Sequence, residues 1–285
     1  MNQTGLYEKA MPIDMKLTDK LNLAKKHGFD YLQLSLDESP QRLERLDWSR
    51  NQKKELVDYM FDHQIRIGSL CCSANRKWPI GHPDQSVRET GIQVIKKAVD
   101  LAVDLGARNI LTSGYDVYQQ TKTPLSRENY IESLKECVNY AASKQVVLSI
   151  EVMDDEFAGS VTKILQIERS IQSPFLQVFP DLGNLTAWVG NQAGDELESG
   201  FKNITEIHFK DGRLVDPNSK LDSFRNVPYG EGDVDFDGLM KVLGRLNYTG
   251  PFVIEMWAHD AGYENEIAVA KHFLDGYLQK YHFDK

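Results

Sequence analysis

Four side chains that commonly bind metal ions each lie at or just after the end of a short apolar run of the sequence. Each run is rich in β-branched and apolar residues, which is typical of a buried parallel strand. Because the four residues are 30, 27 and 47 positions apart, we expect them at the ends of successive strand and helix units. The carboxyl ends of such strands meet at one rim of an α/β barrel. The residues are Glu151 in VVLSIEVMD, Asp181 in LQVFPDLGN, His208 in ITEIHFKD and Glu255 in PFVIEMW.

Three carboxylates and one imidazole form a ligand set for one divalent ion. The set contains no thiolate and a single nitrogen, so it suits Zn²⁺, Mn²⁺ or Mg²⁺ without selecting one of them sharply. We therefore predict that Glu151, Asp181, His208 and Glu255 bind one divalent metal ion. A single acidic residue at a strand end often does no more than cap a helix, so the prediction depends on the convergence of all four.

The two glutamates are also candidates for proton transfer. If a ketose bound the ion through its carbonyl and neighbouring hydroxyl oxygens, the ion would stabilise enolate charge, and the proton on the adjacent carbon would become removable. One carboxylate could take that proton from one face of the sugar, and the other could return a proton to the opposite face. We predict Glu151 and Glu255 as the catalytic acid and base, with inversion of a carbon centre as the result.

The elements that position these residues alternate along the chain. The apolar runs that predict strands are 5–10, 31–36, 66–71, 109–113, 146–151, 176–180, 204–209 and 252–256. The amphipathic stretches that predict helices are 17–27, 49–63, 84–105, 126–143, 160–170, 192–200, 236–246 and 264–281. Eight of each predict a single (β/α)8 TIM barrel, and its 285 residues fit one catalytic domain over 1–285. An open doubly wound sheet is the main alternative, but no G-x-G-x-x-G follows the first strand.

Turn signals and long loops refine this prediction. Ser49 is placed to begin a helix, while Gly28 and Gly106 follow predicted helices as C-terminal stops. Two stretches directly after predicted strands, 181–190 and 211–235, are left without an element. The second is longer than an ordinary connection, which indicates a functional lid or binding loop.

Composition limits the class of partner and the location. The net charge of −9 opposes binding to nucleic acid, although a few local cations can still hold one small anion. The sequence has no apolar stretch of the roughly 20 residues that a membrane helix needs, and its start lacks the apolar core of a secretory signal. The three cysteines show no paired zinc spacing, so we expect them to be reduced and buried. We expect a cytoplasmic protein that binds neither membranes nor nucleic acid.

Several polar residues are candidates for binding an anionic substrate. Arg76, Lys210, Arg225 and Asn226 lie near glycines or strand ends, where arginine and backbone N–H groups can hold a phosphate. Any one of them could equally be a solvated surface group. Asn184 could donate to a substrate hydroxyl, or it could only cap a turn. Among the histidines, His82 and His259 follow predicted strands or precede helices, and could add ligands or proton relays.

Seven segments carry a resemblance to a known family. They are GLYEKAMP, RLDWSR, GYDVY, FPDLGNLTAW, IHFKD, NVPYGEGDVDF and GPFVIEMW. From about residue 5 to 280, the chain resembles the L-ribulose-5-phosphate 3-epimerases of the L-xylulose 5-phosphate branch of pentose and L-ascorbate catabolism, within the xylose-isomerase-like barrel superfamily. The resemblance implies a divalent-metal epimerase that inverts carbon 3 of a ketopentose 5-phosphate. It also implies a homodimer.

Three other functions stay open on the sequence alone. An aldose–ketose isomerase acting at carbons 1 and 2 would use the same enolate chemistry. A metal-dependent endonuclease on the same barrel would need more histidines at strand ends and a surface that attracts DNA. A barrel that only binds a sugar would not require two proton-transfer groups on opposite faces.

Overall fold

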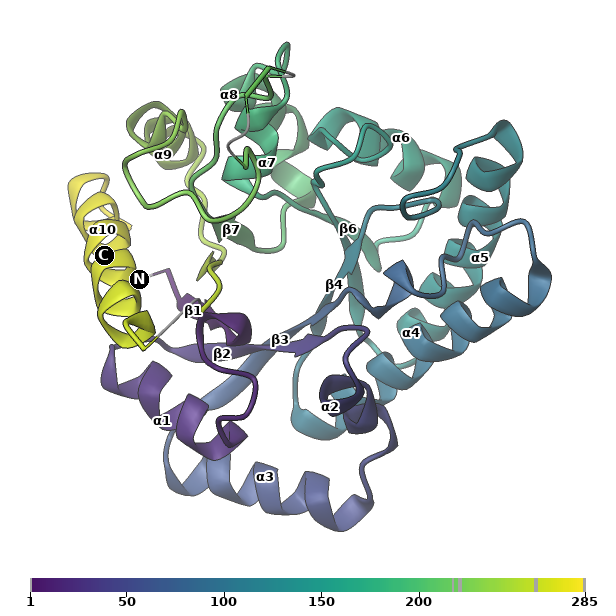
Figure 1. Cartoon of the computed structure of the whole chain (residues 1–285), viewed down its shortest axis with the longest axis horizontal. Helices are drawn as coiled ribbons and strands as arrows, with labels where there is room; N and C mark the ends of the chain where they lie inside the picture. The colour runs from purple at the N-terminus through teal and green to yellow at the C-terminus, as the bar shows by residue number, and fades with distance from the viewer. Residues whose placement is uncertain (1, 217, 220–221, 259–260, 284–285) are drawn as a thin grey trace.

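A ring of helices surrounds a parallel sheet in the computed structural model, which describes residues 2–216, 218–219, 222–258 and 261–283 (Figure 1). The eight strands in these ranges are β1 (Thr4–Tyr7), β2 (Tyr31–Leu36), β3 (Arg66–Cys72), β4 (Asn109–Ser113), β5 (Val147–Glu151), β6 (Leu176–Phe179), β7 (Ile207–Phe209) and β8 (Phe252–Ile254). Their order in the sheet is β6-β5-β4-β3-β2-β1-β8-β7. Two parallel bridges, Val178 with Ile204 and Asp181 with His208, link the segments at the two edges. The strands therefore close into the predicted TIM barrel.

The helices cover the outside of the sheet. They are α1 (Leu17–Lys26), α2 (Pro40–Leu43), α3 (Arg50–Asp62), α4 (Gln85–Leu105), α5 (Pro124–Ser143), α6 (Val161–Ile171), α7 (Leu182–Ala187), α8 (Ala193–Gly200), α9 (Phe236–Arg245) and α10 (Tyr263–Lys280). Short 3-10 helices occur at Glu8–Ala10, Glu44–Asp47, Ala74–Arg76 and Phe201–Asn203. The predicted caps are present: Ser49 forms a capping box with Gln52 at the start of α3, and Gly106 ends α4 with a φ of 79°. A positive φ at this place favours glycine.

The strands are covered on both faces, as parallel strands usually are. Every residue of β2 is buried, for example. Alternate residues of a strand point to the same face, so each strand sends one set of side chains into the barrel. A small apolar cluster contains six buried side chains, one from each of six strands: Tyr7, Tyr31, Cys71, Leu111, Phe179 and Val253. Polar side chains share this space, and Gln33 of β2 hydrogen-bonds to His208 of β7 across the barrel.

Three local differences separate the prediction from the structure. The first strand ends at Tyr7, because Glu8 begins a 3-10 helix and its carboxylate pairs with Arg45 and Lys20. The run 204–209 contributes only Ile207–Phe209 to β7. The stretch 181–190, predicted without an element, contains α7, whose first turn is capped by the side chain of Asp181.

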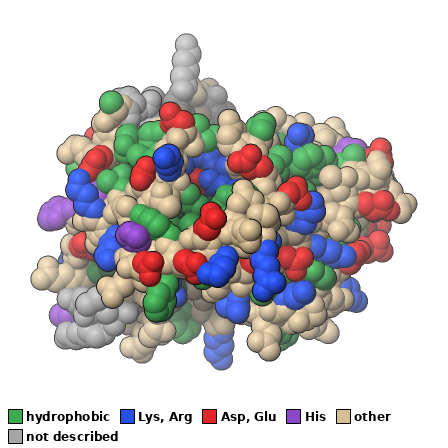
Figure 2. Space-filling view, turned by 90° about the horizontal axis from the view of Figure 1, so that it is seen from below, with side chains coloured by type: hydrophobic (Ala, Val, Ile, Leu, Met, Phe, Trp, Pro, Cys, Tyr) green, Lys and Arg blue, Asp and Glu red, His purple; other side chains and the backbone are tan. Residues whose placement is uncertain are grey.

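The chain ends and the surface complete the description. The two terminal segments lie side by side, with the N–H of Asn2 donating to the carbonyl of Phe283 at 2.8 Å (Figure 1). Acidic and basic side chains are interspersed on the face drawn in Figure 2. Cys71, Cys72 and Cys137 are free and buried, as expected. Within the described ranges, every helix falls short of the length and apolar character that a membrane crossing demands.

Candidate active site

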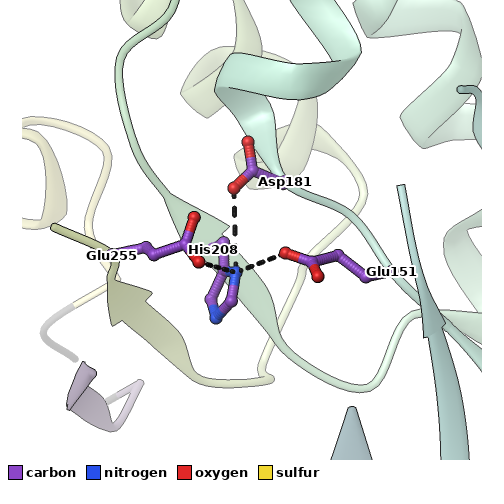
Figure 3. Close-up of side chains that lie close together, drawn as sticks. All are labelled: Glu151, Asp181, His208 and Glu255. Atoms are coloured by element: carbon purple, nitrogen blue, oxygen red, sulfur yellow. Dashed lines mark hydrogen bonds and ion pairs between the residues drawn. The ribbon is translucent and has the colours of Figure 1, made fainter. Parts of the chain in front are cut away.

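The four predicted metal ligands meet at the carboxyl ends of strands β5 to β8. Glu151 is the last residue of β5, and His208 lies within β7. Asp181 follows β6 and caps α7, while Glu255 directly follows β8. All four are buried, and one ligand atom from each lies within 4.8 Å of the others. The four residues at successive strand ends in the sequence therefore form one compact cluster in the structure (Figure 3).

The cluster is arranged around one nitrogen of the imidazole. Nδ1 of His208 lies 3.0 Å from Oε1 of Glu151, 3.6 Å from Oε1 of Glu255 and 3.7 Å from Oδ2 of Asp181 (Figure 3). Asp181 Oδ2 is buried and has no hydrogen-bond partner among the described residues, although Nζ of Lys210 lies 3.0 Å away. Buried polar atoms without a hydrogen bond are rare, and a coordinated ion is one explanation for them. The donor set and its spacing fit one divalent ion.

Burial and mutual charge shift the titration of the cluster. Burial raises the pKa of Glu151 to about 7, against the effect of the neighbouring His208, and burial also raises the pKa of Asp181. Burial acts in the same direction on Glu255, but Lys210 and His208 outweigh it and lower the pKa of Glu255 to about 2. Burial lowers the pKa of His208, yet the surrounding carboxylates, Glu255 first, raise it to about 10. In the metal-free protein, the two glutamates thus differ strongly in acidity.

Lys210 and Asn184 belong to the same cluster. The Lys210 ammonium lies 2.8 Å from Glu255 Oε2 and 3.0 Å from Asp181 Oδ2, and it donates to Asn184 Oδ1 at 3.0 Å. The amide of Asn184 donates to the carbonyl of Val152 at 2.8 Å, which fixes the direction of its oxygen. Its backbone N–H donates to Asp181, so the predicted turn-capping contact exists as well. Lys210 therefore points at the clustered carboxylates of Asp181 and Glu255 rather than at open solvent.

A cavity of about 230 Å³ opens above the cluster. Its walls include Glu151, Glu255, Lys210 and Asn184 on one side. Elsewhere it is bordered by three cations with carboxylate partners: Lys9 lies 2.7 Å from Asp37, Arg76 lies 3.0 Å from Glu38, and Arg225 lies 3.2 Å from Asp154. The structure thus brings the predicted Arg76 and Arg225 to the cavity.

Lys9 was missed because the first run was predicted to extend to residue 10 as a strand. A strand ending at Tyr7 would have placed Lys9 at the catalytic rim, and the change from apolar to charged residues after Tyr7 was the available signal. Asn226 lines a second cavity of about 210 Å³, which shares Lys210 and Glu255 with the first. His82 accepts a hydrogen bond from the N–H of Asp84 and lies outside the four-residue cluster. His259 lies outside the described residues.

The long loop 211–235 is tied to the barrel at several points. Asp211 is buried, and its carboxylate accepts hydrogen bonds from the N–H groups of Gly212, Gly230 and Gly232 at 2.8 to 3.0 Å. Further along, Arg225 reaches Asp154, a residue of the β5–α6 connection. The ring of Phe224 packs 5.6 Å from that of Trp188. The loop therefore brings Phe224 and Arg225 to the cavity wall.

Comparisons with known proteins agree with this geometry. A family model described as xylose isomerase-like TIM barrel matches residues 21–275. The chain is 42% identical over 280 residues to the putative L-ribulose-5-phosphate 3-epimerase SgbU of Escherichia coli strain K12, covering 98% of this chain and 97% of the relative. It is 41% identical to the L-ribulose-5-phosphate 3-epimerase UlaE of Escherichia coli strain SMS-3-5, over 90% of this chain and 88% of UlaE. A crystal structure of a D-tagatose 3-epimerase-like protein, 17% identical, superposes with a TM-score of 0.81 and covers 99% of this chain and 98% of its own.

Proposed function

Because the chain belongs to the xylose isomerase-like TIM barrel family and, within it, to the L-ribulose-5-phosphate 3-epimerases, we propose that it is a divalent-metal-dependent epimerase. Its reaction is inversion of carbon 3 in a ketopentose 5-phosphate, which interconverts L-xylulose 5-phosphate and L-ribulose 5-phosphate. The observation that carries this proposal is the convergence of Glu151, Asp181, His208 and Glu255 beside a cavity bordered by cations. The whole chain, 1–285, acts as one catalytic domain.

The metal ion would be held by the four clustered side chains. Three carboxylates and one imidazole suit Zn²⁺, Mn²⁺ or Mg²⁺. When bound, the ion would supply positive charge beside the oxygens of the ketose, where negative charge develops as the proton leaves. Lys210 would supply a second positive charge in the same place. Its ammonium lies beside Glu255, and Asp181 and Glu255 hold its pKa above the ordinary value despite burial.

The proton transfers are assigned to the two glutamates. Figure 3 shows the carboxyl groups of Glu151 and Glu255 on opposite sides of the His208 nitrogen. Both line the cavity, so a sugar between them would present opposite faces to the two groups. One glutamate removes the proton on carbon 3 and the other delivers a proton to the other face, which inverts the centre.

The phosphate is assigned to the cationic side of the cavity. Arg76 and Arg225 border it, and Lys9 adds a third positive charge. Nε of Arg76 is buried without a hydrogen-bond partner among the described residues, so it is a donor available to an anion. Asn226, which follows Arg225, adds a polar contact from the neighbouring cavity. Lys210 and Asn184 are assigned to the sugar oxygens, because the Lys210 ammonium is directed into the carboxylate cluster, beside Glu255 and Asp181, where the reacting part of the sugar would lie.

The metal assignment is tested by chelation. Protein stripped by a chelator should lose epimerase activity on L-ribulose 5-phosphate and recover it with Mn²⁺ or Zn²⁺. Activity that survives thorough metal removal would contradict the proposal. Proton NMR of the ketose phosphate in D₂O reports the reaction type, because deuterium should enter at carbon 3. Deuterium at carbon 1 would instead identify an aldose–ketose isomerase.

The two-base assignment is tested by substitution of each glutamate. Glu151→Gln and Glu255→Gln should each abolish epimerisation, while one of them can still exchange the carbon 3 proton with solvent deuterium. Glu156→Gln is a matched control, since Glu156 is exposed on the connection that follows β5. Near-normal turnover by either active-site variant would rule out the two-base scheme.

The phosphate assignment is tested by comparing phosphorylated and free sugar. Loss of a hydrogen bond to a charged group costs about 1.5–3 kcal/mol, so Arg76→Met and Arg225→Met should each raise KM for L-ribulose 5-phosphate by about 10- to 100-fold. KM for free L-ribulose should change little. Arg245→Met is the control, because Arg245 is largely exposed and pairs with Glu198 away from the cavity. Equal effects on both sugars would reject the assignment.

Assembly and location complete the proposal. We expect a homodimer, and light scattering should then give twice the chain mass of 32.5 kDa. A cytoplasmic location agrees with three free, buried cysteines. The substrate is a small sugar phosphate. The net charge of −9 and the interspersed charges on the face in Figure 2 speak against an endonuclease.

A further inference from the structure

A chain of buried polar side chains runs from the metal cluster into the interior of the barrel. It begins at Nε2 of His208, the ring nitrogen on the side away from the carboxylates, and continues through Gln33 and Ser69 to Glu206. Gln33 and Ser69 are fully buried, and Glu206 is 5% exposed. Buried polar groups are costly unless they are hydrogen-bonded, so the direction of each bond in such a chain is constrained by its neighbours.

Glu206 determines which group donates and which accepts in each hydrogen bond of this buried series. Its two oxygens receive hydrogen bonds from the hydroxyl of Tyr31 at 2.7 Å, the hydroxyl of Ser69 at 2.9 Å and the amide of Asn109 at 2.8 Å. A carboxylate with three such partners only accepts. The single hydroxyl hydrogen of Ser69 is therefore used toward Glu206, and its oxygen must accept from Nε2 of Gln33, which lies 3.2 Å away.

The orientation of the Gln33 amide then determines the tautomer of the imidazole. With its NH₂ group donating to Ser69, the amide turns Oε1 toward His208, where it lies 2.8 Å from Nε2. A carbonyl oxygen only accepts, so Nε2 carries the hydrogen. We infer that, when the proton on Nδ1 gives way to the ion, Glu206, acting through Ser69 and Gln33, keeps the remaining ring hydrogen of His208 on Nε2, so that the Nδ1 lone pair faces the metal site. Gln33 and Glu206 are positioning residues in this inference, which rests on the metal site of the proposed function.

The opposite tautomer would disrupt the chain at every link. A hydrogen on Nδ1 would occupy the position that faces Glu151, Asp181 and Glu255, and Nε2 would become an acceptor. The Gln33 amide would then have to rotate, and the Ser69 hydroxyl would have to turn from Glu206 to the amide oxygen. Glu206 would lose a donor in the barrel interior, and an unsatisfied buried group of this kind is costly. In a metal-binding histidine, the hydrogen-bond partner of the ring nitrogen that does not bind the ion fixes the tautomer. Loss of that partner typically lowers metal affinity by about 10- to 100-fold.

Metal affinity tests the inference without any need for activity. Gln33→Met keeps an unbranched side chain of similar length but removes the acceptor, and Glu206→Met removes the oxygen that accepts from the Ser69 hydroxyl. Each variant should raise the dissociation constant for Zn²⁺, measured by competition with a chromogenic chelator, by about 10- to 100-fold. Tyr31→Phe is the matched control: it removes a hydrogen bond to the same Oε2 atom of Glu206 but leaves the chain to His208 intact. Its Zn²⁺ affinity should stay close to that of the unsubstituted protein.

A spectroscopic measurement reads the tautomer directly. In Zn²⁺-loaded protein with ¹⁵N-labelled histidine, the His208 ring should show a hydrogen on Nε2 and none on Nδ1. This experiment uses the unsubstituted protein, so it decides the question even if Gln33→Met fails to fold. A ring that is protonated on Nδ1 and binds through Nε2 would overturn the inference, as would folded Gln33→Met and Glu206→Met proteins with unchanged affinity. If the unsubstituted protein itself binds no Zn²⁺, the inference is overturned together with the proposed metal site, whereas unchanged affinity in the variants overturns the inference alone.

Discussion

Metal binding should release protons, and the number released should depend on pH. In the metal-free protein, the carboxylates around His208 raise its pKa to about 10, and burial raises the pKa of Glu151 to about 7. Both groups must lose their protons before they can bind an ion. Raising the pH removes the competing protons, so the affinity for the ion should increase from acid to mildly alkaline solution.

The two pKa values predict how many protons are released and how much the affinity changes with pH. At pH 6 both groups are mostly protonated, so binding should release about two protons per ion; at pH 8 only His208 remains protonated, and the number falls to about one. The affinity should therefore rise by about 1,000-fold between pH 6 and pH 8. Glu151→Gln removes the group that titrates near pH 7, so its affinity should rise by only about 100-fold over the same range.

Calorimetry measures both quantities. Titration of metal-free protein with Mn²⁺ in two weakly metal-binding buffers of different ionisation enthalpy gives the number of protons released, and the same titrations give the affinity. The Glu151→Gln variant separates the two groups, since it should release about one proton at both pH values. Release near zero at pH 8, or equal affinity at pH 6 and pH 8, would refute the reasoning that the ion replaces a proton on His208.

Three further predictions concern the structure around the site. Glu8→Gln should lower the free energy of unfolding by about 3–5 kcal/mol, because it leaves buried cations unpaired. In urea unfolding, the difference in this free energy between the variant and the unsubstituted protein should shrink as the pH falls from the ordinary carboxyl range toward about 2, because the folded protein then protonates Glu8. Glu44→Gln is the control, and it should have little effect because Glu44 is exposed. Asp211→Asn should make the 211–235 loop easier to cleave in limited proteolysis and raise KM, because its carboxylate holds three backbone N–H groups; resistance equal to that of the unsubstituted protein would contradict the anchoring role. Gly183→Ala should lower the unfolding midpoint, because its Cβ would lie 2.7 Å from a backbone oxygen, whereas at Gly194 the nearest contact is an ordinary 3.5 Å and alanine should be tolerated.

The barrel and the convergence of the four side chains could be predicted because their signals are local. Parallel strands are buried on both faces, so each one stands out as a short apolar run. The last strand residues face the catalytic rim, so a carboxylate or imidazole that ends such a run is conspicuous. Glu151 and Glu255 end their runs in the sequence and lie at that rim in the structure. The prediction needed only the type and order of the runs, and small errors in their bounds did not change which end carried the ligand.

Features that depend on nonlocal contacts were harder to predict. The first strand ends at Tyr7 because Glu8 turns to Arg45, which lies 37 positions away in the chain. Without that partner, the run through residue 10 looks continuous, and Lys9 is hidden inside it. Helix α7 is similarly hidden, because it has only six residues and its cap, Asp181, was already assigned as a metal ligand.

The partners inside the barrel depend on its closure. Gln33 and His208 are 175 positions apart, and β1 and β8 separate their strands in the sheet. The sequence does show polar residues, such as Gln33 and Ser69, within strand runs that are otherwise apolar. Since a closed interior offers little water to such groups, they must hydrogen-bond to one another. A polar residue inside a buried run therefore predicts that an internal network exists, but its partner follows only from the stagger of the strands around the barrel.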